Sequence, residues 1–166
     1  KIATQTKVAL VKTDNMTEIA KVLSIMKKAK RFGKKSKAGF YNYNDKGKRE
    51  GFWGGLGTNF KLLKIQPNIE IVKNRLALIQ CLEAMRALES KVLMDIREGD
   101  VGAVLGWGCI PWAGGPFGWM DLKGTDWVYK KCEEFSLEYG SRFSTGNFLK
   151  KLSSKKLGFY EYFEIS

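Results

Sequence analysis

The chain has 166 residues, of which 44% are hydrophobic, and its 29 Lys and Arg against 17 Asp and Glu give a formal net charge of +12 at pH 7. It contains no histidine, and its three cysteines, Cys81, Cys109 and Cys132, are widely spaced. These features disfavour zinc ligation and a disulfide framework, and they predict reduced thiols in a cytosolic-type compartment. No apolar run is long enough to span a bilayer, and nothing resembles a secretory signal.

Helical spacing of apolar residues begins early in the chain, over Lys1–Val11 and again over Thr17–Arg31. In the second of these helices Thr17 is the expected N-cap and Gly33 the expected end. Residues 33–66 hold many glycines and aromatic rings without a sustained helical period. We therefore expect an extended connector after the second helix.

The longest predicted helix covers Asn68–Lys91, because its apolar positions keep a period of 3.6 residues over several turns. We expect it to be the central and most buried helix. Shorter helices are predicted at three later places: Met94–Leu105, Thr125–Tyr139 and Asn147–Leu152. No segment alternates apolar and polar residues as a strand does, so we predict an all-α fold without a sheet of more than two short strands.

Residues 106–121 differ from the rest of the chain, since glycines, prolines and large aromatic side chains crowd together there. This composition predicts an irregular loop and no helix. The pair Gly106-x-Gly108 is a weak dinucleotide-binding signal, because no buried strand precedes it and Pro111 stands where a third glycine is expected. Two alternatives stay open: a rigid loop that lines a cleft, or a buried loop that wedges rings between helices. The second is favoured.

The basic residues are densest between Lys27 and Lys37, and Phe40, Tyr41 and Tyr43 follow at once. Cationic groups beside aromatic rings could bind a single-stranded nucleic acid. However, the other lysines are scattered along the chain and outnumber arginine, which is the usual residue of bidentate base and phosphate recognition. A solvated lysine-rich surface is the favoured interpretation, with a small phosphorylated ligand as a third possibility.

One pentapeptide occurs twice, as Gly-Phe-Tyr-Asn-Tyr at Gly39–Tyr43 and as Gly-Phe-Tyr-Glu-Tyr at Gly158–Tyr162. The spacing is the size of a domain, and too few residues precede the first copy to form an equal unit. The repeat predicts a fragment with one complete unit and the tail of an earlier one. We expect this tail at residues 1–45, a connector at 46–66 and the complete unit at 67–166. The two endings should occupy equivalent positions, with Phe40 and Phe159 inside.

Three stretches resemble the C-terminal region of 3-hydroxyacyl-CoA dehydrogenases, specifically the multifunctional enzymes of fatty-acid β-oxidation whose C-terminal helical domain is duplicated. The stretch from Arg31 to Tyr43 resembles the ending of the first helical domain, except that Lys37 replaces the usual glycine. The second stretch is similar to the start of the second helical domain. The third is similar to the family's signature of Asp-x-Gly, Gly-Gly-Pro-Phe and a later Asp. These two stretches are Ile71–Leu76, and Asp100-Val101-Gly102 with Gly114-Gly115-Pro116-Phe117 and Asp121.

The resemblance implies a helical bundle like the C-terminal domain of 6-phosphogluconate dehydrogenase, within an NAD-dependent L-3-hydroxyacyl-CoA dehydrogenase. The parent enzyme would oxidise 3-hydroxyacyl-CoA to 3-ketoacyl-CoA, with or without a fused enoyl-CoA hydratase module. Its NAD and its catalytic His–Glu pair belong to an upstream Rossmann domain. The implied partners are that domain, the acyl-CoA substrate and a second subunit, in the bacterial cytoplasm or alternatively the mitochondrial matrix.

For this chain itself, the resemblance implies no catalytic, cofactor-binding or metal-binding residue, and no activity alone. We expect it to close the acyl-CoA cleft and to support domain packing and dimerisation. The predicted cleft or interdomain contacts are Asn74, Arg75, Gly114, Gly115, Pro116 and Phe117. Asn74 matches a catalysis-assisting Asn of the family's first domain by motif only, so we assign it a structural role. The alternative function is a non-enzymatic basic helical module that binds nucleic acid.

Overall fold

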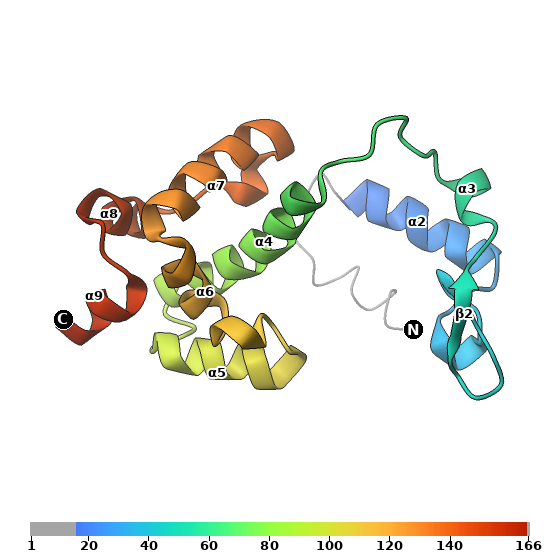
Figure 1. Cartoon of the computed structure of the whole chain (residues 1–166), viewed down its shortest axis with the longest axis horizontal. Helices are drawn as coiled ribbons and strands as arrows, with labels where there is room; N and C mark the ends of the chain where they lie inside the picture. The colour runs from blue at the N-terminus through green and yellow to red at the C-terminus, as the bar shows by residue number, and fades with distance from the viewer. Residues whose placement is uncertain (1–15, 166) are drawn as a thin grey trace. The chain divides into compact units, whose positions relative to one another are not determined.

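The computed structural model describes residues 16–165, which are mostly helical (Figure 1). The predicted helix over Lys1–Val11 lies outside these residues. The all-α class is confirmed, because the one sheet among the described residues has two short strands. The chain divides into two compact units, Lys1–Gln66 and Pro67–Ser166, which are described separately below. The assignment of these units to two repeats stays a prediction.

The first unit begins, in its described part, with helix α2, Met16–Lys28. Thr17 lies inside this helix, so its prediction as the N-cap is wrong. Gly33 is likewise not the end of the helix. Lys30 ends it in the left-handed conformation, with φ of 55°, while the Arg31 N–H donates to the Met26 carbonyl at 2.9 Å. This is a Schellman motif, which satisfies carbonyls of the last helical turn.

A hairpin follows α2 after the short helix η1, Lys34–Ser36. Its strands β1, Tyr41–Tyr43, and β2, Arg49–Phe52, pair antiparallel, and helix α3, Leu56–Asn59, comes next. The guanidinium of Arg31 ties the hairpin to the helix end, because its Nε donates to the Gly39 carbonyl at 2.6 Å.

The second unit contains six helices and two short 3₁₀ turns among its described residues, of which Figure 1 labels the helices. The helices are α4 (Ile69–Glu89), α5 (Ile96–Trp107), α6 (Pro116–Lys123), α7 (Thr125–Tyr139), α8 (Asn147–Lys155) and α9 (Phe159–Ile165). The turns are η2 (Pro111–Ala113) and η3 (Ser141–Phe143). The four helices predicted after residue 67 are therefore confirmed, with ends that differ by at most three residues.

Helix α4 begins where the sequence predicts it, because Asn68 is its N-cap and the Asn68 Oδ1 accepts from the Glu70 N–H at 2.8 Å. The prediction that it is the most buried helix is wrong. Four of its 21 residues are buried, whereas four of the eight residues of α6 are. Helix α4 leaves one side of its first half uncovered, and Ile69 and Leu76 are 64% and 61% exposed.

Helix α6 also corrects the prediction of an irregular loop over residues 106–121. Pro116 is the first residue of α6, a position where the missing proline N–H costs no helical hydrogen bond. Gly115 turns the chain into the helix with φ of 125°. Helix α6 contacts α4, α5, α7 and α9, and Figure 1 shows it among them. A helix with neighbours on several sides can bury Phe117, Trp119 and Met120 at once.

The two copies of the repeated pentapeptide do not fold alike. Residues 41–43 form strand β1, whereas Phe159–Ile165 forms helix α9. Phe159 is fully buried as predicted, but Phe40 is 47% exposed, so the prediction for Phe40 is wrong. One backbone feature is shared: Lys37 and Lys156, two residues before each glycine, have φ of 54° and 55°. A left-handed backbone explains why the family pattern has a glycine in the place of Lys37.

Candidate functional site

The carboxylate of Asp100 lies at the centre of the second unit and is bound by the N-terminus of α6. The residue is 2% exposed, and its oxygens accept from the N–H groups of Phe117 at 2.7 Å and Gly118 at 2.9 Å. These N–H groups belong to the first turn of a helix, where no helical carbonyl is available to them. The negative charge also interacts favourably with the helix dipole. Asp100 thereby fixes α6 to α5.

The glycines before α6 allow this close approach. A Cβ atom on Gly115 would lie 2.6 Å from Asp100 Oδ1, and its φ of 125° already disfavours an L side chain. A Cβ atom on Gly118 would collide with the Ala113 carbonyl oxygen. The Gly-Gly-Pro-Phe signature therefore forms the N-terminus of a buried helix that binds the Asp100 carboxylate.

Asp121 makes a similar connection at the other end of α6. Its oxygens accept from the N–H groups of Phe159 at 2.6 Å and Tyr160 at 3.0 Å, which open α9. Burial raises the pKa of the Asp121 carboxyl, while these two hydrogen bonds lower it in part. Gly158 leaves the room required, since a Cβ there would lie 3.0 Å from Asp121 Oδ2.

Tyr160 joins the two carboxylates into one network. Its hydroxyl donates to Asp100 Oδ2 at 3.0 Å, while its backbone N–H donates to Asp121. Burial, followed by the hydrogen bond to Asp100, raises the pKa of the Tyr160 hydroxyl to about 12. We name this arrangement the carboxylate network, defined by Asp100, Asp121 and Tyr160. Its two carboxylates, carried by α5 and α6, bind backbone N–H groups of α6 and α9, so the network connects three helices and organises the fold.

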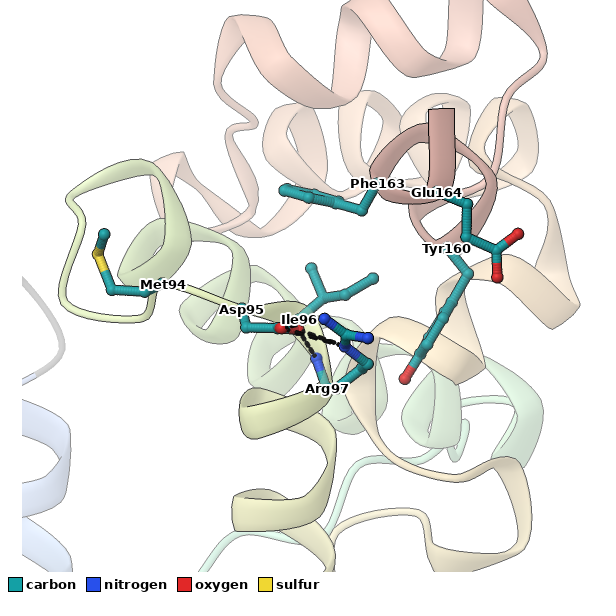
Figure 2. Close-up of a pocket in the computed structure, with 7 residues that line it drawn as sticks. All are labelled: Met94, Asp95, Ile96, Arg97, Tyr160, Phe163 and Glu164. Atoms are coloured by element: carbon teal, nitrogen blue, oxygen red, sulfur yellow. Dashed lines mark hydrogen bonds and ion pairs between the residues drawn. The ribbon is translucent and has the colours of Figure 1, made fainter. Parts of the chain in front are cut away.

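A shallow pocket of about 230 Å³ lies beside Tyr160, between the start of α5 and α9 (Figure 2). Its lining residues are Met94, Asp95, Ile96, Arg97, Tyr160, Phe163 and Glu164. The Arg97 guanidinium is already engaged, since its Nε and Nη2 bind the Asp95 carboxylate at 2.9 and 2.5 Å. Arg97 also holds the pKa of Asp95 below its usual value. Because Arg97 is paired with Asp95, the lining of this pocket has no free cationic group to anchor an anionic ligand.

The predicted contact residues fall into two groups. Gly115, Pro116 and Phe117 are buried inside the second unit, so these residues are not available to another domain while this unit is folded. The other three predicted contact residues lie at or near the surface, and they are Asn74, Arg75 and Gly114. Their role in a cleft or an interdomain contact stays a prediction.

The Gly106-x-Gly108 pair stands at the C-terminus of α5, and phosphate binding would need a helix N-terminus. The N–H groups of Gly108 and Cys109 donate to the Val104 and Ala103 carbonyls at 3.0 and 3.1 Å. These donors are therefore occupied. Among residues 16–165 no group of three His, Cys, Asp or Glu side chains could hold a metal ion. No helix in that range has the length and apolar character needed to cross a membrane.

Comparison with known proteins places the chain in a family of metabolic multienzyme subunits: it belongs to the family of the alpha subunits of fatty acid oxidation complexes. The alpha subunit of Vibrio parahaemolyticus is 37% identical over 128 residues, which cover 74% of this chain and 17% of that protein. The Vibrio vulnificus subunit is 35% identical over 79% of this chain and 18% of its own length. The Shewanella oneidensis subunit is 33% identical over 78% of this chain and 19% of its own.

The match confirms the resemblance seen in the sequence, to a C-terminal part of that multifunctional subunit. The chain spans less than a fifth of these three relatives. No protein-family model matches it.

The members of the carboxylate network were not among the residues predicted as site residues. Asp100 and Asp121 stood in the signature, and Tyr160 in the second pentapeptide. The available signal was Asp100, which stands shortly before the glycine-rich segment that begins at Gly106 and contains Pro116-Phe117. That pattern does not reveal that the partners of the carboxylates are backbone N–H groups.

Proposed function

We propose that this chain is the helical C-terminal part of an NAD-dependent L-3-hydroxyacyl-CoA dehydrogenase of fatty-acid β-oxidation. The observation that carries the proposal is the match to alpha subunits of fatty acid oxidation complexes over about three quarters of the chain. The parent protein would oxidise the 3-hydroxyl group of an acyl-CoA, with NAD as the hydride acceptor. Its location would be the bacterial cytoplasm.

The residues of this chain do not fit NAD. Dinucleotide binding in this class uses a parallel sheet followed by a glycine-rich turn at a helix N-terminus. The described residues offer only an antiparallel hairpin, and the Gly106-x-Gly108 donors are occupied. We therefore assign NAD to an upstream Rossmann domain of the parent protein.

The chain should be inactive alone. Removing the proton of a 3-hydroxyl group requires a base that titrates near neutral pH, for which histidine is best suited, and the sequence contains none. The carboxylate network cannot substitute, because its oxygens already accept hydrogen bonds from α6, α9 and Tyr160. The role left for this part is to pack against the other domains, to close the acyl-CoA cleft and to support a homodimer.

A chimera tests the proposal. In the alpha subunit of Vibrio parahaemolyticus, the segment matched by this chain is replaced by residues 1–166, and 3-hydroxyacyl-CoA oxidation is followed through NADH absorbance. We expect the chimera to keep dehydrogenase activity and the isolated chain to have none. The control is the same subunit with the segment deleted. A soluble chimera no more active than the deletion control would contradict the proposal, as would micromolar NAD binding by the isolated chain in calorimetry.

The geometry disfavours the nucleic-acid alternative. The Tyr41 ring stacks on Phe52 with 4.7 Å between centroids, and the Arg49 guanidinium lies 4.6 Å from the same ring. The Trp53 ring is covered by Arg31 at 4.8 Å. Rings already engaged within the chain are poor platforms for stacked bases. Saturable binding of a short single strand at physiological salt that is lost in Tyr41→Ala would overturn this view.

A further inference from the structure

A groove runs beside the first half of α4 and is separate from the carboxylate network. It has a volume of about 250 Å³ and is lined by Val72, Arg75, Leu76 and Ile79 of α4 with Arg142 and Phe143 of η3. We name these six residues the α4 groove. Its floor is apolar and its charged side chains are both arginines.

The apolar residues of α4 continue the groove along the helix surface. Ile69, Val72, Leu76 and Ile79 are spaced by three, four and three residues, so they form one line on the helix. Ile69 and Leu76 are 64% and 61% exposed, and Val72 and Ile79 are half-buried. At 1.5 Å per residue the line is about 15 Å long. Such a line has the spacing and length with which one helix packs against another.

Within residues 16–165 the two arginines have no acidic partner. The guanidinium of Arg75 lies 3.7 Å from the centre of the Tyr139 ring, and its Nε is buried without a hydrogen-bond acceptor among the described residues. The Arg142 side chain makes no ion pair or hydrogen bond within residues 16–165.

Other arginines of this unit are neutralised within the chain. Arg86 is paired with Glu83, and Arg97 with Asp95. The α4 groove therefore combines uncovered apolar surface with uncompensated positive charge. A partner that supplies both apolar side chains and carboxylates would satisfy each feature.

We infer that the α4 groove is the docking surface for an acidic amphipathic helix. The inference rests on the packing role proposed above and adds the surface and the chemistry of the partner. A second copy of the chain fits less well, because a symmetric contact through this face would bring arginines together. A small molecule also fits less well, because the apolar line extends beyond the pocket to the exposed Ile69.

Two synthetic helical peptides test the inference. Both carry leucine with the spacing of one helical face, and their other positions are Glu in one peptide and Lys in the other. Binding to the full chain is followed at physiological salt by the NMR signals of the Val72, Leu76 and Ile79 methyl groups. We expect the Glu peptide to bind at least tenfold more tightly than the Lys peptide. In a third peptide serine replaces leucine, and we expect no saturable binding.

Substitutions in the chain test whether the Glu peptide binds at the α4 groove. The double variant Arg75→Gln/Arg142→Gln should remove most of the preference for the Glu peptide, and Leu76→Glu should weaken its binding at least tenfold. Leu76 is exposed, so that variant tests docking without disturbing the core. Arg97→Gln is the matched control and should bind like the natural chain, because Arg97 lies outside the groove and is paired with Asp95.

Three results would overturn the inference. The first is equal binding of the Glu and Lys peptides. The second is binding of the serine peptide as tight as that of the leucine peptide. The third is an unchanged set of Val72, Leu76 and Ile79 methyl signals on addition of the Glu peptide. Since NAD and acyl-CoA play no part in this experiment, its failure would leave the dehydrogenase proposal standing. An inactive chimera, in turn, would not affect the peptide result.

Discussion

Replacing Asp100 by Asn should unfold the second unit at a markedly lower denaturant concentration. The substitution keeps the size of the side chain but removes its charge and turns one acceptor oxygen into an NH₂ donor. In the structure the two oxygens serve three donors, which are the N–H groups of Phe117 and Gly118 and the hydroxyl of Tyr160. The asparagine oxygen can serve the Phe117 N–H, and its NH₂ group then faces the Gly118 N–H.

The expected loss follows from these groups. A buried donor left without an acceptor costs about 1–3 kcal/mol, and the lost attraction of a carboxylate to a helix N-terminus adds about 0.3–1 kcal/mol. Tyr160 can rotate its hydroxyl, so it contributes less. Together we expect Asp100→Asn to lower the free energy of unfolding by about 2–4 kcal/mol, a large part of the 5–15 kcal/mol typical of a domain.

Urea denaturation followed by tryptophan fluorescence measures this loss, because Trp119 is 3% exposed in the core of the same unit. Asp95→Asn is the matched control. Asp95 also caps a helix, accepting from the Arg97 N–H at 2.8 Å, but it lies at the surface, so its loss should be clearly smaller. If Asp100→Asn changed the free energy of unfolding no more than Asp95→Asn, Asp100 would not organise the fold.

Three further predictions address the same network and the helix ends. The pKa of Tyr160 is raised to about 12 in the folded chain, against about 10 in the unfolded chain. The contribution of Tyr160 to stability is therefore complete below pH ~10 and is lost as the pH rises toward 12. Tyr160→Phe should flatten this part of a plot of unfolding free energy against pH, and an unchanged slope would contradict the assignment. Gly115→Ala should lower the free energy of unfolding measured in urea by about 2–4 kcal/mol, because the added methyl group would meet the Asp100 carboxylate and the φ of Gly115 is 125°. A loss below about 0.5 kcal/mol would show that the backbone before α6 can relax. Lys156→Gly should stabilise the unit by about 0.5–1 kcal/mol, since Lys156 has φ of 55°, and a lower melting temperature would refute this.

Some elements followed directly from local sequence signals. Helix α4 was predicted to begin at Asn68, and Asn68 is its N-cap because an Asn side chain can accept the N–H two residues on; the apolar period then continues without a break. The prediction over Thr125–Tyr139 matches α7 at both ends. Gly124 precedes α7 and Gly140 follows it, so both ends are marked by a change in backbone preference.

Helix α6 could not be predicted in the same way, because its stability comes from its surroundings. Glycine and proline have low helix propensity, and both are frequent in residues 106–121. In the structure Gly115 turns the chain into the helix, Pro116 occupies the first position and Gly118 lies in the first turn. The buried Asp100 carboxylate supplies the cap from 17 residues away, which no local pattern reveals.

The two copies of the repeated pentapeptide also show that local sequence alone does not determine secondary structure. Equal sequence predicted equal structure, yet residues 41–43 pair with β2 while Phe159 begins α9. The difference lies in the partner that each copy meets. Tyr41 finds Phe52 across a hairpin, whereas the N–H group of Phe159 finds Asp121. Five residues are too few to choose between strand and helix without such a partner.

The hydrogen bonds of the carboxylate network close loops of very different length. The bond between Asp100 and the Phe117 N–H spans 17 residues, and the bond between Asp100 and the Tyr160 hydroxyl spans 60. Loop-closure entropy grows with the logarithm of loop length, so the longer closure costs about 1 kcal/mol more. The pairing of α5 with α6 can therefore form early and by itself, while α9 joins only after the intervening helices have condensed. In hydrogen exchange the amides of α9 should open first, as a separate cooperative step, before those of α6.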